Sequence, residues 1–214
     1  MDLLVSKRPP SAALGRPREF DEEKVLAAAA RTFWEHGYHE TSIEVLCEAT
    51  GLLRGSLYSA YGDKKGILMA ALAHYSEGRV ARLARSLRKR NLGRNVLREG
   101  LLYYVQTASD LERARACFIT NTALELTPQD PGVAQLVERV FRRMAALWTE
   151  AALRARDEGF FDLKLDAMAA GNYLLCVAQG LRVLGKIYRE KELTDMVDMA
   201  LRALEERPAQ SSKA

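Results

Sequence analysis

Apolar residues recur every three or four positions along most of this chain, which is the spacing of one face of an α-helix. The first such stripe consists of Val25, Leu26, Ala29 and Phe33. A longer stripe starts at Ile67 and runs to about residue 90. No stretch shows the sustained alternation of apolar and polar residues that predicts a half-buried strand. The pattern therefore predicts an all-α protein of about nine helices.

Residues that start and stop helices divide this pattern into two units. Asp21 is a predicted N-cap, Gly37 a predicted end, and Asp130 followed by Pro131 a strong predicted start. We expect three short helices in residues 20–66, joined through a long helix to a larger helical unit in residues 67–207. Residues 1–19 are expected to form a flexible basic arm and residues 208–214 a loose tail.

The stretch from Thr41 to Lys65 has the pattern of two short helices joined by a tight turn. Thr41 and Glu44 have the spacing of a capping box, in which a hydroxyl accepts the amide proton three residues on. The turn Thr50-Gly51-Leu52 has the length that joins the two helices of a helix-turn-helix. The stretch therefore predicts that motif.

The second of these short helices, from Leu53 to Tyr61, has few apolar anchors for its length. It offers a guanidinium, hydroxyls, phenols and a bare glycine, groups that can contact base edges and phosphates. The candidate DNA contacts are Thr41, Arg54, Gly55, Ser56, Tyr58, Ser59 and Tyr61. A glycine inside a helix costs about 1 kcal/mol against alanine, and close approach to a DNA backbone is a reason to keep one.

Lys64 and Lys65 follow Asp63, a predicted N-cap, and so stand in the first turn of the long helix. Cations are unfavourable at that end of the helix dipole. A phosphate docked on the helix start would reverse the sign, because amide protons and both ammonium groups would meet one anion. Lys64 and Lys65 are therefore added to the DNA contacts.

Together with the lead-in from Phe33 to Ser42, the stretch up to Lys65 resembles the DNA-binding domain of the TetR family of bacterial transcription regulators. The resemblance covers about residues 20 to 70. Two positions depart from the family pattern. Leu53 stands where a capping serine is usual, and Ala60 stands where a histidine or aromatic residue often precedes the last aromatic.

The resemblance implies a homodimer that binds a palindromic operator on double-stranded DNA, usually as a repressor. It also implies a cavity in the second domain for a small-molecule effector that releases DNA. Leu165 to Tyr188 is apolar nearly all round, and with the last helix it is the expected dimer interface, a four-helix bundle within about residues 165–207.

Charge modifies this interpretation only in part. Residues 1–66 hold nine Lys/Arg and ten Asp/Glu, so the predicted DNA-binding unit is close to neutral although the chain carries +4. Arg16 and Arg18 could enter a minor groove or belong to an untethered tail. The run from Arg79 to Arg98 has eight Lys/Arg and no acid; it is either a solvated face or a surface that attracts DNA or an anionic ligand.

Candidate residues for the effector pocket are polar or polarisable groups on otherwise apolar helix faces. They are Tyr104, Cys117, Asn121, Trp148, Tyr173 and Cys176, and ordinary core packing is the alternative for each. Cys117 follows Arg113 and Arg115, which would lower a thiol pKa if they approach it, so a thiol-based sensor of oxidants or electrophiles is a second hypothesis.

Other classes of function have less support in the sequence. No nucleophile stands beside a base in a recognisable arrangement, which argues against an enzyme. A ligand-independent architectural DNA binder would not need so large a second domain. We expect no cofactor, metal site or membrane span, and the three separated cysteines favour the reducing cytoplasm.

Overall fold

The structure is a computed structural model, and it describes residues 20–90, 92–106, 115–162 and 164–205. These residues form helices and loops, with no strand among them, which confirms the predicted all-α class. Arg16, Arg18, the predicted arm and the predicted tail lie outside the described residues.

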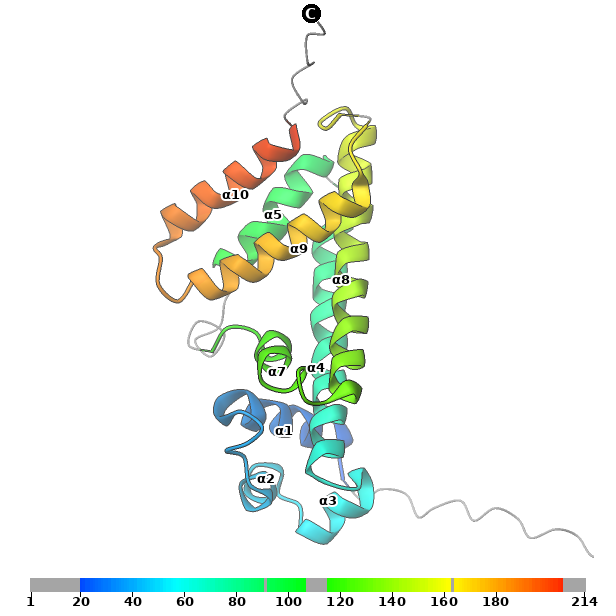
Figure 1. The fold of residues 1–214 in the computed structure, drawn as a ribbon, viewed down its shortest axis with the longest axis vertical. Coiled ribbons are helices and arrows are strands. Elements are labelled where there is room, and N and C mark those ends of the chain that lie inside the picture. The colour runs from blue at the N-terminus through cyan, green and yellow to red at the C-terminus, as the bar shows by residue number, and fades with distance from the viewer. Residues whose placement is uncertain (1–19, 91, 107–114, 163, 206–214) are drawn as a thin grey trace, which may run out of the picture.

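Three short helices gather at one end of the molecule, at the bottom of Figure 1. They are α1 (Glu22–His36), α2 (Ile43–Thr50) and α3 (Arg54–Tyr61). As predicted, Asp21 caps α1 by accepting the Lys24 amide proton, and Gly37 ends it with φ 81°. That φ is open to glycine and strained for other residues.

A pair of long helices forms the spine of the molecule (Figure 1). α4 (Lys64–Leu87) and α8 (Pro131–Asp157) run side by side in the same direction. Ion pairs mark this register: Lys65 with Asp130 near both starts, Glu77 with Arg143 midway, and Arg88 with Glu150 near the end of α4. Asp63 and Asp130 cap the two helices, as predicted.

The remaining helices complete the larger unit. α5 (Gly93–Gln106), α9 (Ala167–Leu184) and α10 (Glu190–Glu205) lie beside the upper spine, and α7 (Phe118–Leu126) lies between them and α1 (Figure 1). The sequence pattern by itself predicts a helix from Ala114 to Leu126. That start is wrong, because Ala116 has φ 60°, which no right-handed helix accommodates, and α7 begins at Phe118.

The core is continuous from α1 to α10. Its largest fully buried side chains are Trp148, Phe33 and Phe118. Gly171 of α9 meets α8 so closely that an added Cβ would stand 2.1 Å from Thr149 Oγ1, so the absence of a side chain there allows the two helices to pack closely.

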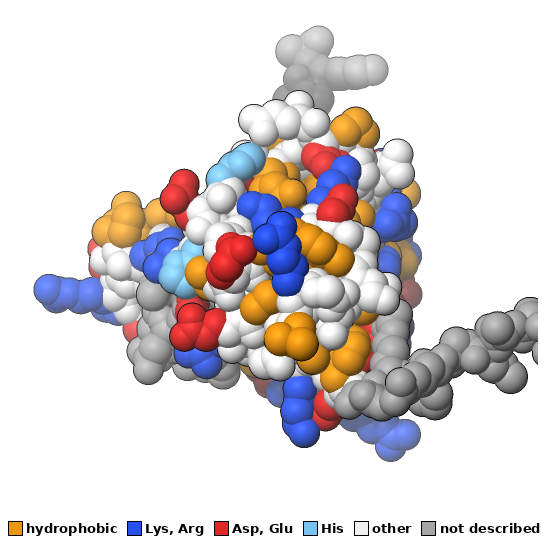
Figure 2. Space-filling view, turned by 90° about the horizontal axis from the view of Figure 1, so that it is seen from below, with side chains coloured by type: hydrophobic (Ala, Val, Ile, Leu, Met, Phe, Trp, Pro, Cys, Tyr) orange, Lys and Arg blue, Asp and Glu red, His pale blue; other side chains and the backbone are white. Residues whose placement is uncertain are grey.

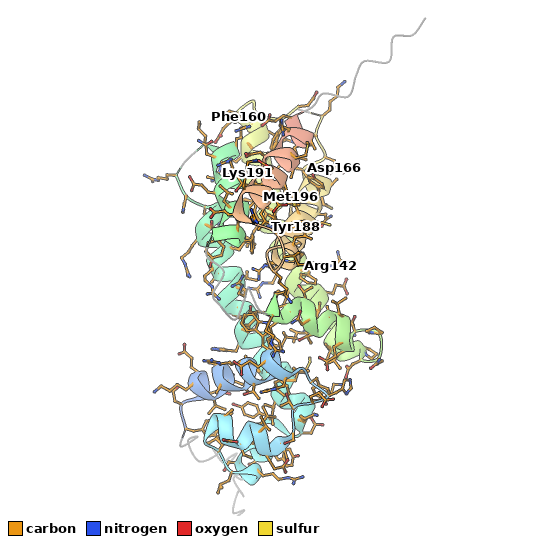
Figure 3. All side chains as sticks on the ribbon, turned by 90° about the vertical axis from the view of Figure 1, so that its left-hand side faces the viewer. Arg142, Phe160, Asp166, Tyr188, Lys191 and Met196 are labelled. Atoms are coloured by element: carbon orange, nitrogen blue, oxygen red, sulfur yellow. The ribbon has the colours of Figure 1, made fainter. Side chains whose placement is uncertain are left out.

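α9 is less buried than its apolar composition predicted. By length and composition alone it could cross a membrane, so the expectation that no run resembles a span is corrected on that count. Such a test is also passed by a core helix of a soluble protein. Asp166 caps α9, Tyr188 follows it, and Met196 lies on α10, all labelled in Figure 3.

The basic run is mostly paired. Arg88, Lys89, Arg94 and Arg98 face acids on α8, α5 and α10, and Arg79 is buried. Arg88 and Lys89 keep 62% and 58% of their side chains exposed, as the solvated-face interpretation expects, whereas Arg94 and Arg98 are more enclosed.

Candidate nucleic-acid interface

The predicted helix-turn-helix consists of α2, the turn at Gly51 and α3. Gly51 has φ 70°, the left-handed conformation that ends many helices, and its amide donates to Cys47 O at 2.9 Å. Leu46 of α2 and Leu57 of α3 are fully buried and attach both helices to the core. The opposite side of α3 is left at the surface.

The exposed side of α3 carries the polar groups that the sequence indicated. Arg54, Gly55, Ser56 and Ser59 are exposed, and Tyr58 and Tyr61 are half-buried. A Cβ added at Gly55 would meet nothing within 4 Å, so a flat partner could approach the backbone there.

The start of α3 has no side-chain cap. Leu53 occupies the N-cap position, makes no capping hydrogen bond and is 80% exposed. Free amide protons at a helix start are good donors to a phosphate. The departure at Leu53 therefore leaves the first turn of α3 available to DNA.

Arg54 is held along this surface by two weak contacts. Its Nη1 lies 3.6 Å from Glu44 Oε1 on α2, and its guanidinium carbon lies 5.3 Å from the centre of the Tyr58 ring. Both side chains of the ion pair are largely exposed, so solvent screens it. A phosphate or a guanine edge could replace Glu44 at small cost.

Thr41 does not lie on this surface, and the predicted capping box is wrong. Ser42 is the N-cap of α2 and accepts the Val45 amide proton at 3.3 Å. Thr41 is fully buried and donates to Gly37 O at 2.6 Å. Its hydroxyl is therefore not accessible to DNA. The residue that caps α2 is Ser42, one position after the predicted Thr41.

Lys64 and Lys65 each contact acceptors of the protein itself, and their contact with a phosphate stays a prediction. Lys64 Nζ donates to Tyr38 O and Thr41 O, both at 2.9 Å, and lies over the Tyr38 ring. Lys65 Nζ lies 2.6 Å from Asp130 Oδ2, and this hydrogen bond raises the pKa of Lys65 and lowers that of Asp130. Both ammonium groups already have protein acceptors.

Glu125, which sequence reasoning missed, holds the same turn from the other side. Its carboxylate, at the end of α7, accepts the amide protons of Tyr38 and His39 at distances of 2.9–3.1 Å. No sequence signal could have revealed this contact, because its partners are main-chain groups 87 and 86 residues away. We call Lys64 and Glu125, with the turn 37–41 that they hold, the turn clamp.

Figure 2 views the molecule from the helix-turn-helix end. Basic side chains are scattered there among acidic, polar and apolar ones and do not form a continuous patch. Residues 20–66, the described part of this end, hold five Lys/Arg and eight Asp/Glu. Recognition by this face must then depend on where groups are placed more than on net charge.

The predicted pocket residues do not form one site. Tyr104, Cys117 and Trp148 are buried, whereas Tyr173 and Cys176 are exposed on α9. Asn121 lines a separate cavity of about 240 Å³ between α1, α4 and α7, together with Glu125 and Arg115. Tyr173 and Cys176 are thus corrected from lining residues to surface residues.

Within the described part of the chain, no group of three or more His, Cys, Asp or Glu side chains is placed to hold a metal ion. His39 belongs to the turn clamp, and His36 lines the cavity beside it.

A buried scaffold that presents a polar second helix after a glycine turn has the geometry of a helix-turn-helix DNA-binding protein. The comparisons with known proteins agree. Residues 25–71 match the model of the bacterial regulatory proteins of the tetR family, and residues 93–203 match the tetracyclin repressor-like C-terminal domain. The chain belongs to the TetR family of transcriptional regulators, which are not enzymes.

Relatives and solved structures extend this match over the whole fold. The uncharacterized HTH-type transcriptional regulator YezE of Bacillus subtilis is 33% identical over 90% of this chain and 100% of its own length. The HTH-type transcriptional repressor ComR of Escherichia coli is 24% identical over 79% of this chain and 81% of its own.

Among solved structures, a cysteine variant of the TetR family regulator CifR, complexed with 26-bp operator DNA, is 29% identical. The match has a TM-score of 0.76 and covers 89% of this chain and all of that one. Reduced Escherichia coli NemR, 18% identical with a TM-score of 0.69 over 88% of this chain and 98% of its own, shares the fold.

Proposed function

We propose that this protein is a homodimeric repressor that binds a palindromic operator and is released from it by a small-molecule effector. The proposal rests on the exposed, uncapped start of α3. Arg54 and Gly55 lie there at the surface, and a Cβ added at Gly55 would meet nothing within 4 Å. CifR, which is 29% identical and was solved in complex with operator DNA, supports operator binding by this chain.

The surface of α9 supports dimerisation. Tyr173, Cys176, Gly180 and Val183 follow one another at spacings of three and four residues, and Ile187 continues the row in the next turn. Tyr173, Val183 and Ile187 are 39%, 47% and 76% exposed. An apolar row with this spacing is typical of the seam between paired helices. A second copy of the chain would bury it, and two-fold symmetry would place two α3 helices on one face of DNA.

The turn clamp supports coupling between effector and DNA. Residues 20–66 form the proposed DNA-binding domain and residues 67–207 the effector and dimer domain. Two acidic residues of the second domain hold residues of the proposed DNA-binding domain. Glu125 accepts the amide protons of Tyr38 and His39. Asp130 forms an ion pair with Lys65 at the start of α4. Any shift of α7 or of the start of α8 would therefore move the turn before α2.

α7 also contacts α9, a helix of the proposed effector domain. Thr120 Oγ1 donates to Gln179 Oε1 of α9 at 2.9 Å, five residues before Glu125. An effector that displaced α9 from α7 would thus reach the turn clamp through one short helix. A coupling of about 1–3 kcal/mol is usual for such regulation.

The thiol-sensor alternative has no comparable support. Cys117 is 2% exposed, so an oxidant or electrophile would meet it only after local opening. We place the regulator in the cytoplasm, where a bacterial operator is found.

Selection of bound sequences from random duplex DNA tests the proposal. The wild-type protein should recover a palindromic consensus with half-sites about one helical turn apart, or a multiple of it. Arg54→Ala should weaken binding to that consensus by about 1–3 kcal/mol, as expected for loss of a base contact. Arg31→Ala, which removes an exposed arginine of α1 paired with Glu35, is the matched control and should leave affinity unchanged. Recovery without a pattern would favour a non-specific architectural binder.

A further inference from the structure

Arg182 lies in the last turn of α9 and is almost fully enclosed. It is 8% exposed, and its guanidinium carbon lies 4.3 Å from the centre of the Tyr104 ring on α5. Enclosing a permanent charge is unfavourable unless an anion or several acceptors compensate it. The aromatic face supplies part of that compensation but no hydrogen-bond acceptor in the plane of the guanidinium.

The nitrogens Nε and Nη2 of Arg182 are buried and have no hydrogen-bond partner in the described part of the chain. These two nitrogens form the side-on edge of a guanidinium, which binds both oxygens of a carboxylate. The same molecule shows that geometry elsewhere: Arg98 uses Nε and Nη2 to bind Asp198 Oδ1 and Oδ2 at 2.7 and 3.1 Å. At Arg98 this edge binds the carboxylate of Asp198. At Arg182 no acceptor among the described residues binds the same edge.

Gln179 adds a third donor on the same side of α9, since it lies three residues before Arg182. Its Oε1 accepts from Thr120, but its Nε2 is buried and has no partner among the described residues. Donors without acceptors thus come from two neighbouring side chains.

The surroundings are cationic and aromatic. Burial raises the pKa of Tyr104, so its phenol stays neutral, and the charge of Arg79 acts on it in the opposite direction. Arg79 is itself 5% exposed. Among the described groups that act electrostatically on Tyr104 there are tyrosines, Cys117 and Arg79 but no carboxylate.

We propose that the effector carries a carboxylate, which binds side-on to Arg182 and accepts a further hydrogen bond from Gln179 Nε2, with its apolar part near Tyr104. The inference rests on the proposed ligand response and names the chemical class of the effector. It also names the first step of that response. An anion that accepts a hydrogen bond from Gln179 would disturb the hydrogen bond between Gln179 and Thr120, and through Thr120 it would act on α7.

Stability without ligand provides the first test. Arg182→Met removes an enclosed charge that lacks an anion, so the melting temperature should stay the same or rise. Arg98→Met is the matched control; it leaves Asp198 without its partner, so the melting temperature should fall by about 1–4 °C. A fall in Arg182→Met as large as that in Arg98→Met would make Arg182 a structural residue and overturn the proposal.

Ligand binding provides the second test, with hexanoate, decanoate, benzoate and phenylacetate as probes and their primary amides as neutral controls. At least one carboxylate should raise the melting temperature of the wild-type protein and release it from the selected DNA. Its amide, and the same acid with Arg182→Lys, should bind about 10- to 100-fold more weakly, as expected for loss of a charged, two-point contact. No response to any of the acids would overturn the proposal.

The two proposals fail in different ways. Release of DNA by amides as well as by acids, unchanged in Arg182→Lys, would keep the ligand response and overturn the carboxylate inference. Normal operator selection with no release by any compound would count against both.

Asp110 and Glu112, which lie outside the described residues, are two carboxylates of the protein itself. The double variant D110N/E112Q removes both and is the control for binding of Arg182 by a side chain of the protein. Unchanged affinity for the active acid supports an external carboxylate. A marked rise in affinity would mean that a side chain of this protein competes for Arg182, and would overturn the inference.

Discussion

At the scale of single residues, this protein uses charged side chains to hold main-chain groups of one turn. Glu125 accepts two amide protons there, and Lys64 donates to two carbonyl oxygens. Hydrogen bonds to charged groups contribute about 1.5–3 kcal/mol each, roughly twice as much as neutral ones. The turn clamp is therefore a local source of stability as well as a link between domains.

Glu125→Gln should loosen the turn, because the amide keeps one acceptor oxygen and replaces the other with a donor. We expect the free energy of unfolding to fall by about 1–3 kcal/mol. Hydrogen exchange at the amides of Tyr38 and His39 should become faster, as measured by mass spectrometry.

Glu138→Gln is the control for that variant, since Glu138 pairs with Arg142 on the exposed side of α8. Equal exchange rates in wild-type protein and Glu125→Gln would show that the carboxylate does not hold the turn.

Lys64→Met should affect folding more than DNA binding. The variant leaves Tyr38 O and Thr41 O without their shared donor, so we expect about 1–3 kcal/mol of lost stability in urea titrations. The slope of operator affinity against salt concentration should stay the same, because the ammonium group is already used. A slope reduced by about one charge, with unchanged stability, would restore Lys64 as a phosphate contact.

At the scale of helices, the residues that cap a helix predicted most helix starts correctly. Which side of a helix is buried depends on contacts with residues far away in the sequence. Asp21, Asp63 and Asp130 cap their helices as expected, since a cap bonds within its own turn. The start of α7 was misplaced because the left-handed conformation of Ala116 carries no sequence mark.

The predicted effector pocket failed for a related reason. Tyr173 and Cys176 stand on the same apolar helix as Arg182, and the sequence does not say which side faces the core. Arg182 was passed over because a charged residue near a helix end is usually solvated.

Gly171→Ala tests the packing of α9 on α8. The added methyl would approach Thr149 and the main chain of α8, so we expect a loss of about 1–3 kcal/mol in unfolding by urea. Gly78→Ala on α4 is the control: its Cβ would meet nothing within 4 Å, and it should gain about 0.5–1 kcal/mol from helix propensity. A stable Gly171→Ala protein would mean that the two helices are farther apart than described.

The pair of Arg98 on α5 and Asp198 on α10 predicts a dependence on pH. Their hydrogen bond lowers the pKa of Asp198 below its ordinary 3.8. A lowered folded-state pKa gives stability that is present above the unfolded value and is lost as the pH falls through the folded value. Asp198→Asn should therefore be less stable than wild-type at pH 7, and the difference should shrink below about pH 4, measured by urea unfolding. A constant difference across that range would exclude the ion pair as its cause.

At the scale of the whole molecule, the exposed row on α9 should decide the oligomeric state. Val183→Glu places a charge in the middle of the proposed seam, so we expect monomers by light scattering and weaker binding to the palindrome. Leu124→Glu, at a residue of α7 that is 77% exposed, is the control and should remain a dimer. A dimeric Val183→Glu protein would place the interface on another surface.

The turn clamp has a consequence for exchanging parts between related regulators. Glu125 binds the amide protons of residues 38 and 39, which every amino acid except proline carries. A foreign helix-turn-helix grafted before α4 would keep these bonds whatever side chains it brings, provided its turn has the same backbone. The bonds of Glu125 would thus leave the choice of helix-turn-helix open, and a chimera made at this joint would need to match the side chains that α1 packs against α4 and α7.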